Sequence, residues 1–379
     1  MHYNLSYISK KKQAFLKKRL SKNYILHLNL NYKILKNAYI MTSDFYNGIL
    51  YSGGIISDNN KFQLSSAWHE GCTFRNRFEN YNVQSRNESV IYIGCLYHIW
   101  GHAITDNLKK IWYLYNTNQN KKLVYITVNN VPLPSYVYEL FELAGIDLHK
   151  AEHITQITKF KEIINPDNSI ININEERYFT KEFTQVINKI KSQVPTKNIG
   201  KIYFTRTHLR QNRDIGEVKI EKAFQKKGYT IIAPEEYSIK EQVSMLKGCT
   251  AFAATEGSIS HSSIFCKPEI EVILLRKVDY INPYSCFINQ MCSLNVTYID
   301  IHHSTLSPKE YPWRGPFYLY ITNGLSKYLG MYGIHLPYFL HLSWYEYRFK
   351  IKDRILNTFY KIRAKIGLRT RLNSIFKTK

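Results

Sequence analysis

The sequence predicts an α/β protein with doubly wound parallel sheets, and three observations favour it. In the second half of the chain, short apolar runs of strand length alternate with helical patterns. The helical patterns are about ten residues long, which suits the connections between parallel strands in βαβ units. Of the 379 residues, 44% are hydrophobic, so the chain can bury a large core divided over two or three domains.

The second half shows these elements in a regular order. Ser238 and Glu241 have the spacing of a capping box, and Gly248 follows as a helix stop. Helices are therefore predicted at 215–227 and 239–247. Strands are predicted at 202–205, 229–233, 250–254 and 270–275.

The first half is less regular but shows the same kinds of element. Its strands are predicted at 90–93 and 123–128, and its helices at 102–115, 136–144 and 181–193. The last of these helices is polar and leads through Pro195 and Gly200 into the strand at 202. We therefore place a domain boundary there.

The net charge of +23 indicates an acidic partner, and this charge is concentrated at the two ends. Residues 1–22 contain seven Lys and Arg and no acid, while residues 341–379 contain eleven against two acids. The sequence between them is only mildly basic, so we expect most of the excess outside the folded body. The possible partners are nucleic acid, an anionic membrane surface and a phosphorylated substrate.

The six cysteines are scattered through apolar surroundings without a C-x-x-C pair or zinc-ligand spacing. They predict reduced, buried thiols in a cytosolic protein. No run approaches the roughly 18 apolar residues of a spanning helix, and no apolar segment follows the basic N-terminus. We therefore expect neither secretion nor membrane spanning.

Polar residues follow the predicted strands of the second half, at the sheet edge where open parallel sheets bind ligands. Guanidinium groups and a Gly/Ser-rich turn entering a helix are suited to a diphosphate. An isolated loop arginine is usually only solvated, but these strand ends complement one another. The candidates are Arg206, Arg210 and Arg213 after the first strand, Glu235 after the second, and Glu256, Gly257, Ser258 and His261 after the third.

The first half offers one compact polar cluster around His102. If a helix begins near Gly101, His102 and Asp106 lie at i and i+4 on one face and can pair. Such a pair could deprotonate an acceptor hydroxyl. The cluster could also be a helix start with a satisfied histidine, or, less well, a metal site of His98, His102 and Asp106.

Several common signatures are absent from the sequence. It contains no G-x-x-x-x-G-K-[ST] phosphate loop, no G-x-G-x-x-G, no G-x-S-x-G elbow and no D-x-D pair to hold a metal on a nucleotide diphosphate. An enzyme that handles a sugar nucleotide would then neutralise the diphosphate with Arg, Lys and helix dipoles.

Four segments, in the right order over about 90–280, resemble glycosyltransferase family 61, whose bacterial members sit largely in capsular and lipopolysaccharide gene clusters. They are W-G-H-x-x-x-D (100–106), I-Y-F-T-R with R-D-I-G-E (202–206 and 213–217), the Pro-Glu block (228–243) and A-T-E-G-S-I-S-H-S-S-I-F (254–265). The sequence departs from the family pattern at Gly216, Glu256 and Ser262, where Asn, His and Asn are common. The departures at Glu256 and Ser262 leave the sugar and the nucleotide open.

The resemblance implies a GT-B-like architecture, in which two Rossmann-like doubly wound domains face a cleft. It also implies inversion at the anomeric carbon without an essential metal or cofactor. The expected parts are a basic segment 1–22, an acceptor-side α/β domain 23–195, a nucleotide-sugar-binding α/β domain 196–340 and a basic amphipathic C-terminal helix in 341–379.

The resemblance also implies roles for the candidate residues. Arg206 and Arg213 would contact the diphosphate, and Glu256, Gly257 and Ser258 with His261 would line the donor pocket. Because the acceptor attacks opposite the leaving group, the base belongs to the N-terminal domain. Asp106, oriented by His102 or acting through it, is the candidate. The expected partners are a nucleotide sugar and a saccharide or lipid-linked saccharide acceptor.

Two other functions remain open on the sequence. A non-catalytic nucleic-acid binder would also be basic, but no recognised nucleic-acid module appears. A transferase that adds pyruvyl or a phospho-sugar to a polysaccharide would keep the anion site and change the donor.

The C-terminal tail has an amphipathic pattern. Ile351, Ile355, Phe359, Ile362 and Ile366 trace one helical face opposite a basic side, as in a helix lying on an anionic leaflet. A helix that packs its apolar stripe back on the body would show the same pattern. We expect a cytoplasmic protein, peripheral on the inner face of the cytoplasmic membrane.

Overall fold

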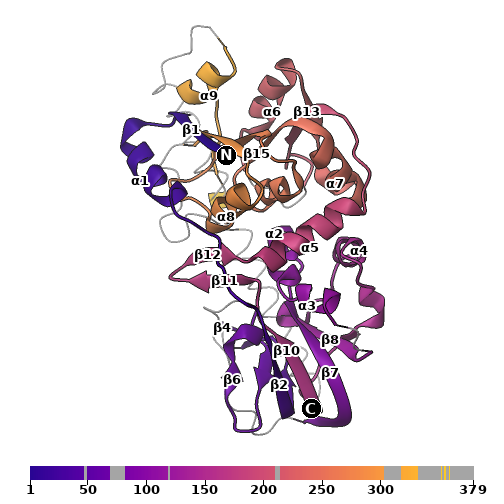
Figure 1. Ribbon diagram of the computed structural model, residues 1–379. Coiled ribbons are helices and arrows are strands. Elements are labelled where there is room, and N and C mark those ends of the chain that lie inside the picture. The colour runs from indigo at the N-terminus through magenta and orange to yellow at the C-terminus, as the bar shows by residue number, and fades with distance from the viewer. Residues whose placement is uncertain are drawn as a thin grey trace, which may run out of the picture.

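A computed structural model describes residues 1–46, 49–68, 82–117, 120–209, 214–302 and 317–331, with four residues between 351 and 358. The chain forms a mixed α/β structure around two large sheets. Figure 1 shows these sheets in two halves of the molecule, with α2 (Trp100–Ala103) and α5 (Lys181–Ser192) at their junction.

The first large sheet has six strands, all parallel, in the order β1-β17-β16-β15-β13-β14. The predicted strands of the second half are confirmed, because each lies within a residue or two of an observed one. The strands are β1 (His2–Tyr7), β13 (Gly200–Phe204), β14 (Tyr229–Ile232), β15 (Cys249–Thr255), β16 (Glu271–Arg276) and β17 (Asn295–Asp300).

Helices connect these strands as predicted. The capping box at the start of α7 is formed: Glu241 N donates to Ser238 Oγ (3.2 Å), and Ser238 N donates to Glu241 Oε2 (2.9 Å). The helical elements of this half are α6 (Glu217–Lys226), η5 (Pro234–Glu236), α7 (Ile239–Gly248), η6 (Ser258–Phe265), α8 (Pro283–Met291) and α9 (Asn323–Tyr328).

The basic N-terminal segment is part of the folded body, contrary to expectation. Strand β1 forms an edge of the six-stranded sheet beside β17, and α1 (Lys10–Leu20) follows it. Lys12 pairs with Asp279 and Asp300, at 2.5 and 3.2 Å. Leu5, Ile8 and the α1 residues Leu16 and Leu20 are buried, so apolar contacts hold this segment together with its ion pairs.

The second large sheet is mixed, so it differs from the second parallel sheet that we expected. Strands β10, β7, β8 and β9 are parallel, but β2, β5 and β6 continue the sheet in antiparallel pairs. In spatial order the strands are β6 (Phe62–Gln63), β5 (Gly54–Ile56), β2 (Tyr32–Met41), β10 (Thr158–Pro166), β7 (Gln84–Leu96), β8 (Lys122–Thr127) and β9 (Glu152–His153).

The helix predicted at 102–115 is wrong as one element. The chain forms α2, then η2 (Asp106–Leu108), then α3 (Trp112–Tyr115). Thr105, at φ −122° and ψ −81°, leaves the helical region, and its hydroxyl donates to Gly101 O at 2.7 Å. This side-chain bond competes with the helical backbone bonds and ends α2 after one turn.

The remaining elements complete the N-terminal half and the junction. Helices α4 (Ser135–Leu143) and α5 are confirmed near their predicted bounds. The smaller elements are η1 (Leu64–Ser66), η3 (Val128–Asn130), η4 (Leu148–Lys150), and the hairpins β3 (Asp44–Tyr46) with β4 (Ile49–Tyr51) and β11 (Ile170–Ile173) with β12 (Glu176–Phe179).

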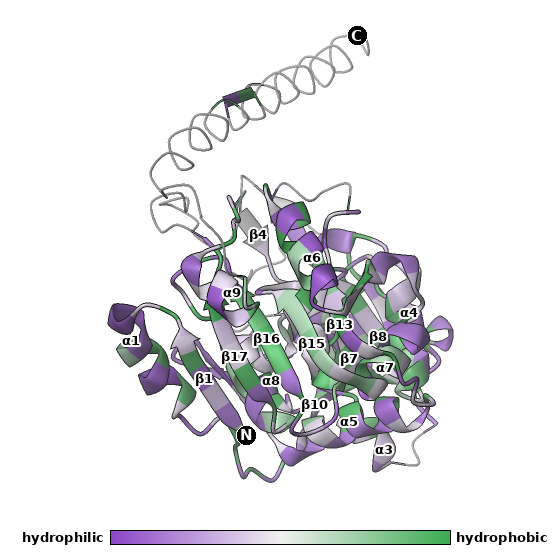
Figure 2. Cartoon of the chain, turned by 90° about the horizontal axis from the view of Figure 1, so that it is seen from above, coloured by the Kyte–Doolittle hydropathy of each residue, from purple (hydrophilic) through white to green (hydrophobic). Residues whose placement is uncertain are grey.

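One hydrophobic core runs through the junction of the two sheets. It contains Ile91 from β7, Phe183 from α5 and Ile202 from β13, each with at most 1% of its surface exposed. Figure 2 shows hydrophobic residues along β15 and β16 and hydrophilic residues over much of α1. Because burial is continuous here, the two halves are packed together; the domain bounds drawn from the sequence stay a prediction.

The structure tests the prediction of buried cysteine thiols, and only a small part of the predicted C-terminal helix in 341–379. Cys95, Cys249, Cys266, Cys286 and Cys292 are free and buried, as predicted; Cys72 lies outside the described residues. Most of the predicted C-terminal helix also lies outside them. Within the described ranges, no helix combines the length and the apolar character needed to cross a bilayer.

Candidate active site

Each large sheet has a point at which its strand order reverses, and the candidate residues lie there. In the six-stranded sheet the reversal falls between β13 and β15, the strands that Arg206 and Glu256 follow. In the other sheet it falls between β7 and β10, and the segment that carries His102 follows β7. Ligands of open α/β sheets bind at such points, outside the carboxyl ends of the strands.

The two strand ends meet through direct contacts between α2 and η6. Trp100 Nε1 donates to Ser262 Oγ at 2.9 Å. A Cβ atom at Gly101 would lie 2.9 Å from His261 Nδ1 and 3.0 Å from Ser258 Oγ, so only glycine permits this approach. The predicted segment around His102 is therefore brought against Ser258 and His261 of the other half.

The predicted pair of His102 and Asp106 is formed. His102 Nδ1 lies 2.6 Å from Asp106 Oδ2, and the side chains are 25% and 8% exposed. The break after α2 does not separate them. Asn107 fixes the preceding loop: its Oδ1 accepts from Tyr97 N (2.9 Å) and its Nδ2 donates to Tyr97 O (3.0 Å).

Asp106 is held as a carboxylate. Burial opposes its ionisation, but the hydrogen bond and charge of His102, with the charges of Lys109 and Arg177, hold the pKa of Asp106 well below its usual range. An ionised carboxylate only accepts hydrogen bonds, so His102 Nδ1 carries the proton that faces it. The lone pair of neutral His102 is then on Nε2.

Aromatic rings surround the His102 imidazole. The ring centroids of Trp68, Tyr97 and Tyr284 lie 5.1, 5.4 and 5.9 Å from that of His102. These rings restrict its rotation and leave the orientation of Nε2 defined. None of these three residues was predicted as a site residue; Trp68 and Tyr284 lie far from His102 in the sequence, so no motif spacing connects them.

The turn after β15 supplies the candidates from the second half. Gly257 has φ 137°, and Ser260 Oγ accepts from Gly257 N (3.2 Å) and donates to Gly257 O (2.8 Å). His261 is 4% exposed, and burial, with the nearby charge of His102, lowers its pKa to about 3. Neither ring nitrogen makes a hydrogen bond of ordinary geometry within the described part of the chain. His261 is therefore a neutral imidazole beside the pair.

Tyr284 is a site residue that the sequence reasoning missed. Its hydroxyl donates to Asp106 Oδ2 at 2.7 Å, and its ring lies 5.4 Å from that of His261. It stands in the first turn of α8, where Asn282 caps the helix and Pro283 begins it. That Asn-Pro signal predicts a helix start, but it gives no indication that the start faces Asp106.

Asp214 forms ion pairs with two cationic side chains, which follow β13 and β16. Asp214 Oδ2 is 3.5 Å from Arg206 Nη1 and 3.0 Å from Lys277 Nζ. Burial lowers the pKa of Lys277, and Asp214 opposes that shift. The side chain of Arg206 is 31% exposed. Lys277 was not predicted, and Arg210 and Arg213 lie outside the described residues.

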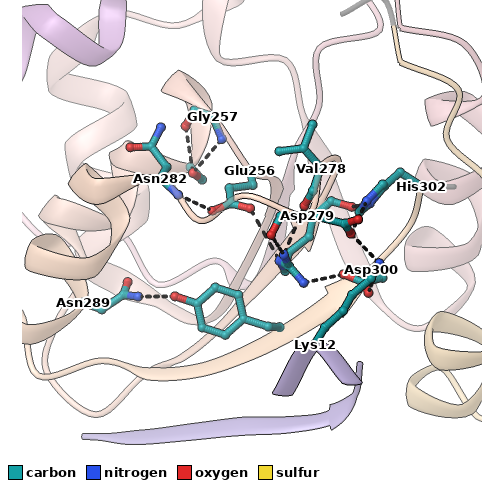
Figure 3. A network of polar contacts seen from close by, with 12 residues as sticks. Lys12, Glu256, Gly257, Val278, Asp279, Asn282, Asn289, Asp300 and His302 are labelled. Atoms are coloured by element: carbon teal, nitrogen blue, oxygen red, sulfur yellow. Dashed lines mark hydrogen bonds and ion pairs between the residues drawn. The ribbon is translucent and has the colours of Figure 1, made fainter. Parts of the chain in front are cut away.

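The two candidate glutamates have different surroundings. Glu256 is buried; its Oε1 accepts from Asn282 N at 3.1 Å, its Oε2 lies 4.0 Å from Arg276 Nε, and burial raises its pKa. Figure 3 shows Glu256 in a network that extends to Asp300 and Lys12. Glu235 is exposed in η5. Contact of either glutamate with a donor stays a prediction.

The sequence left open a metal site formed by His98, His102 and Asp106. Over the described ranges, no three His, Cys, Asp or Glu side chains gather closely enough to hold a metal ion. His102 instead directs Nδ1 to Asp106. The cationic side chains Arg206 and Lys277 lie at the strand ends of the six-stranded sheet.

A histidine–carboxylate pair in one half and cationic side chains at the strand ends of the other are suited to group transfer from an anionic donor. Residues 100–273 match the family model described as glycosyltransferase 61. This segment is a glycosyltransferase family 61 domain, which identifies the protein as a glycosyltransferase; an enzyme of that class would use a nucleotide-sugar donor and a saccharide acceptor. No curated protein matches the chain.

The matched segment contains the motifs from which the family was predicted. It begins at Trp100, includes His102, Asp106 and Arg206, and continues past His261 into β16. The predicted family is therefore confirmed. Lys277 and Tyr284 lie beyond the matched segment.

Proposed function

We propose that the protein is an inverting, metal-independent glycosyltransferase that acts on a growing surface polysaccharide, of the capsule or lipopolysaccharide kind. The observation that supports this most is the pairing of His102 with Asp106 at 2.6 Å, beside the contact of α2 with η6. We further propose a GT-B-like layout, in which the reversal points of the two sheets form the donor and acceptor sides.

In the proposed reaction, the acceptor hydroxyl oxygen attacks the anomeric carbon of the donor sugar. The bond from that carbon to the diphosphate oxygen breaks as the new bond forms, so the configuration inverts. His102 Nε2 takes the hydroxyl proton, and Asp106 stabilises the resulting imidazolium through Nδ1–H. The low pKa of Asp106 makes it a weak base, which favours His102 as the proton acceptor.

The leaving diphosphate carries the negative charge that the reaction releases. Arg206 and Lys277 are suited to stabilise it, and Arg213 is expected to add to them. Gly257, Ser258 and His261 line the neighbouring turn and are suited to contact the donor sugar or its nucleotide. Cationic side chains thus perform the role that a metal performs in D-x-D enzymes, so we propose no metal requirement.

A panel of nucleotide sugars tests this function. The purified full chain is incubated with each donor, and thermal stabilisation and donor hydrolysis are measured. We expect one nucleotide diphosphate to stabilise the protein, and His102→Gln to keep that stabilisation while losing transfer. The exposed His149→Gln is the matched control and retains both. Stabilisation by none of the nucleotides, but by another phosphorylated donor, would favour a pyruvyl or phospho-sugar transferase.

Helix α1 supports the proposed position on an anionic membrane face. Lys10, Lys11, Lys17 and Lys18 are exposed, and Phe15 is 51% exposed among them. A basic surface with a central aromatic residue is suited to anionic lipid headgroups. We propose that α1 and the basic tail together hold the enzyme near lipid-linked acceptors.

Vesicle flotation tests the membrane proposal. We expect binding to vesicles that contain phosphatidylglycerol and not to neutral ones, with binding weakened by Phe15→Ser and by Lys17→Glu/Lys18→Glu. A chain that lacks 345–379 separates the contribution of the tail. Equal binding to neutral and anionic vesicles contradicts the proposal.

A further inference from the structure

Asp106 receives two hydrogen bonds on the same oxygen. Oδ2 lies 2.6 Å from His102 Nδ1 and 2.7 Å from Tyr284 Oη. The two donors come from different halves of the chain, since Tyr284 belongs to α8. The position of the carboxylate therefore depends on both halves being packed together.

The Tyr284 phenol is a fixed donor. Its side chain is 9% exposed, and burial, followed by the charge of Asp106, raises its pKa well above the usual value. It therefore keeps its proton over the pH range of enzyme action. Asn282 Oδ1 accepts from Tyr284 N at 2.9 Å, which fixes the helix turn that carries the ring.

Arg177 makes a cation–π contact with the Tyr284 ring. Its guanidinium carbon lies 5.2 Å from the ring centroid, and Arg177 is 8% exposed. It stands on β12, beside Glu176, which pairs with Arg19 of α1 at 2.6 Å. The tyrosine is thus held between the dyad and a buried cation.

We propose that Tyr284, supported by Arg177, is a positioning residue for the His102–Asp106 dyad. This inference rests on the proposed function, in which His102 is the base. By donating to Oδ2, Tyr284 fixes the carboxylate against Nδ1–H and takes up part of its negative charge. The basicity of His102 is thereby set from the α8 side.

The direction of the effect follows from the groups that face the dyad. A carboxylate relieved of one donor attracts the imidazolium more strongly, so loss of the Tyr284 hydroxyl raises the pKa of His102. Loss of the Arg177 charge removes its repulsion of the His102 imidazolium, so it is also expected to raise the pKa of His102. The titratable and charged groups around the dyad are Lys109 on its own segment, Tyr97 at the end of β7, Arg177 on β12, His261 on η6 and Tyr284 on α8.

The test is a ¹⁵N titration of His102 in the full chain, with its resonances assigned by their loss in His102→Gln. In Tyr284→Phe we expect the His102 pKa to rise by about half a unit or more. Tyr115→Phe is the matched control, because its hydroxyl also makes a 2.7 Å bond, to Ala144 O, away from the dyad. We expect no shift there.

Arg177→Gln provides a second test if Tyr284→Phe does not fold. It should also raise the His102 pKa. Where a donor has been found, turnover is measured as a function of pH. The acid limb of the profile should shift to higher pH by the same amount as the His102 pKa.

The titration needs no donor, so its outcome is separate from that of the proposed function. An unchanged His102 pKa in folded Tyr284→Phe, or in folded Arg177→Gln where the first variant does not fold, overturns the inference. Absence of transfer from every donor by the unmodified protein overturns the proposed function instead.

Discussion

At the scale of single residues, the carboxylate of Asp106 determines how the site can work. It is buried, yet its neighbours keep it ionised. Since it is a weak base, its proposed role is to hold the proton on His102 Nδ1 and to stabilise the charge that His102 acquires. That role requires a carboxylate and not merely a hydrogen-bonding side chain.

Replacement of Asp106 by Asn tests this role. We expect transfer to fall by roughly 10²- to 10⁴-fold, because an amide can donate to Nδ1 and so favours the wrong imidazole tautomer. Thermal stabilisation by the donor should remain, since the donor contacts come from other residues. Near-normal turnover of Asp106→Asn with a confirmed donor would remove Asp106 from the mechanism.

His261 predicts how stability depends on pH. Its folded-state pKa of about 3 lies below the ordinary value near 6.5, so the unfolded chain binds a proton that the folded chain does not. Stability should therefore decrease as the pH falls from about 6.5 towards 3, by about 1 kcal/mol per unit from this group. Urea unfolding at pH 7, 6 and 5 measures this slope, and His261→Gln should make it shallower. Identical slopes in the two proteins would contradict the prediction.

At the scale of elements, the contact of α2 with η6 assembles the site. Gly101 makes it possible because a side chain there would collide with His261 and Ser258. The sequence predicted both segments, but predicted a long helix where α2 ends after one turn. The deciding interactions, the Thr105 bond to Gly101 O and the approach of η6, are local geometry and tertiary packing that periodicity does not encode.

Gly101→Ala tests this contact. We expect a loss of about 1–3 kcal/mol in the free energy of unfolding, together with loss of transfer, because the methyl group separates α2 from η6. Gly228→Ala is a useful comparison: its φ of 79° also disfavours alanine, but nothing lies near the added carbon. It should lose stability and keep transfer per folded molecule. Equal transfer by both variants would show that the close approach at Gly101 is unnecessary.

The strand ends show how far sequence reasoning reached at this scale. The positions of Arg206 and Glu256 after adjacent strands were predictable, because β13 and β15 are short apolar runs with clear stops. Tyr284 and Lys277 were not predictable, since α8 and the end of β16 approach the site only through the packing of the whole sheet. The contacts of Lys277 with Asp214 and of Tyr284 with Asp106 span 63 and 178 positions, so they leave no recognisable spacing in the sequence.

At the scale of the whole molecule, the sequence predicted the α/β class and the family but placed the N-terminal charge wrongly. A run of lysines is usually a solvated segment, yet Lys12 and Arg19 meet acids across the molecule. The antiparallel part of the second sheet was also missed, because polar and apolar residues do not alternate regularly along β2, so its sequence does not distinguish a strand from a loop. Both errors concern long-range pairing.

Removal of residues 1–22 tests the structural role of the N-terminal segment. It would expose the edge of β17 and leave Asp300 without Lys12. We expect a loss of about 3 kcal/mol or more in the free energy of unfolding. Substitution of the exposed Lys10 and Lys11 by Ala should change it by less than about 0.5 kcal/mol. Equal urea midpoints for the truncated and full chains would contradict this role.

Treatment with a chelator tests whether the whole enzyme needs a metal ion. The proposed charge stabilisation uses Arg206 and Lys277, so transfer should stay within about twofold after treatment with EDTA, whereas a reaction that uses a metal as Lewis acid would lose most of its rate. Substitution of Lys277 by Met should lower transfer by about tenfold or more. Full recovery by added Mg²⁺ of activity lost to EDTA would contradict the metal-independent mechanism.

The pairing of β1 with β17 also affects how the protein is made. Residues 2–7 are synthesised nearly three hundred residues before their partner at 295–300. During that interval β1 cannot occupy its place, and the sheet that holds the donor-side residues remains one strand short. Closure of this edge is therefore a late, long-range step, and it is the step at which association between incomplete chains is most expected.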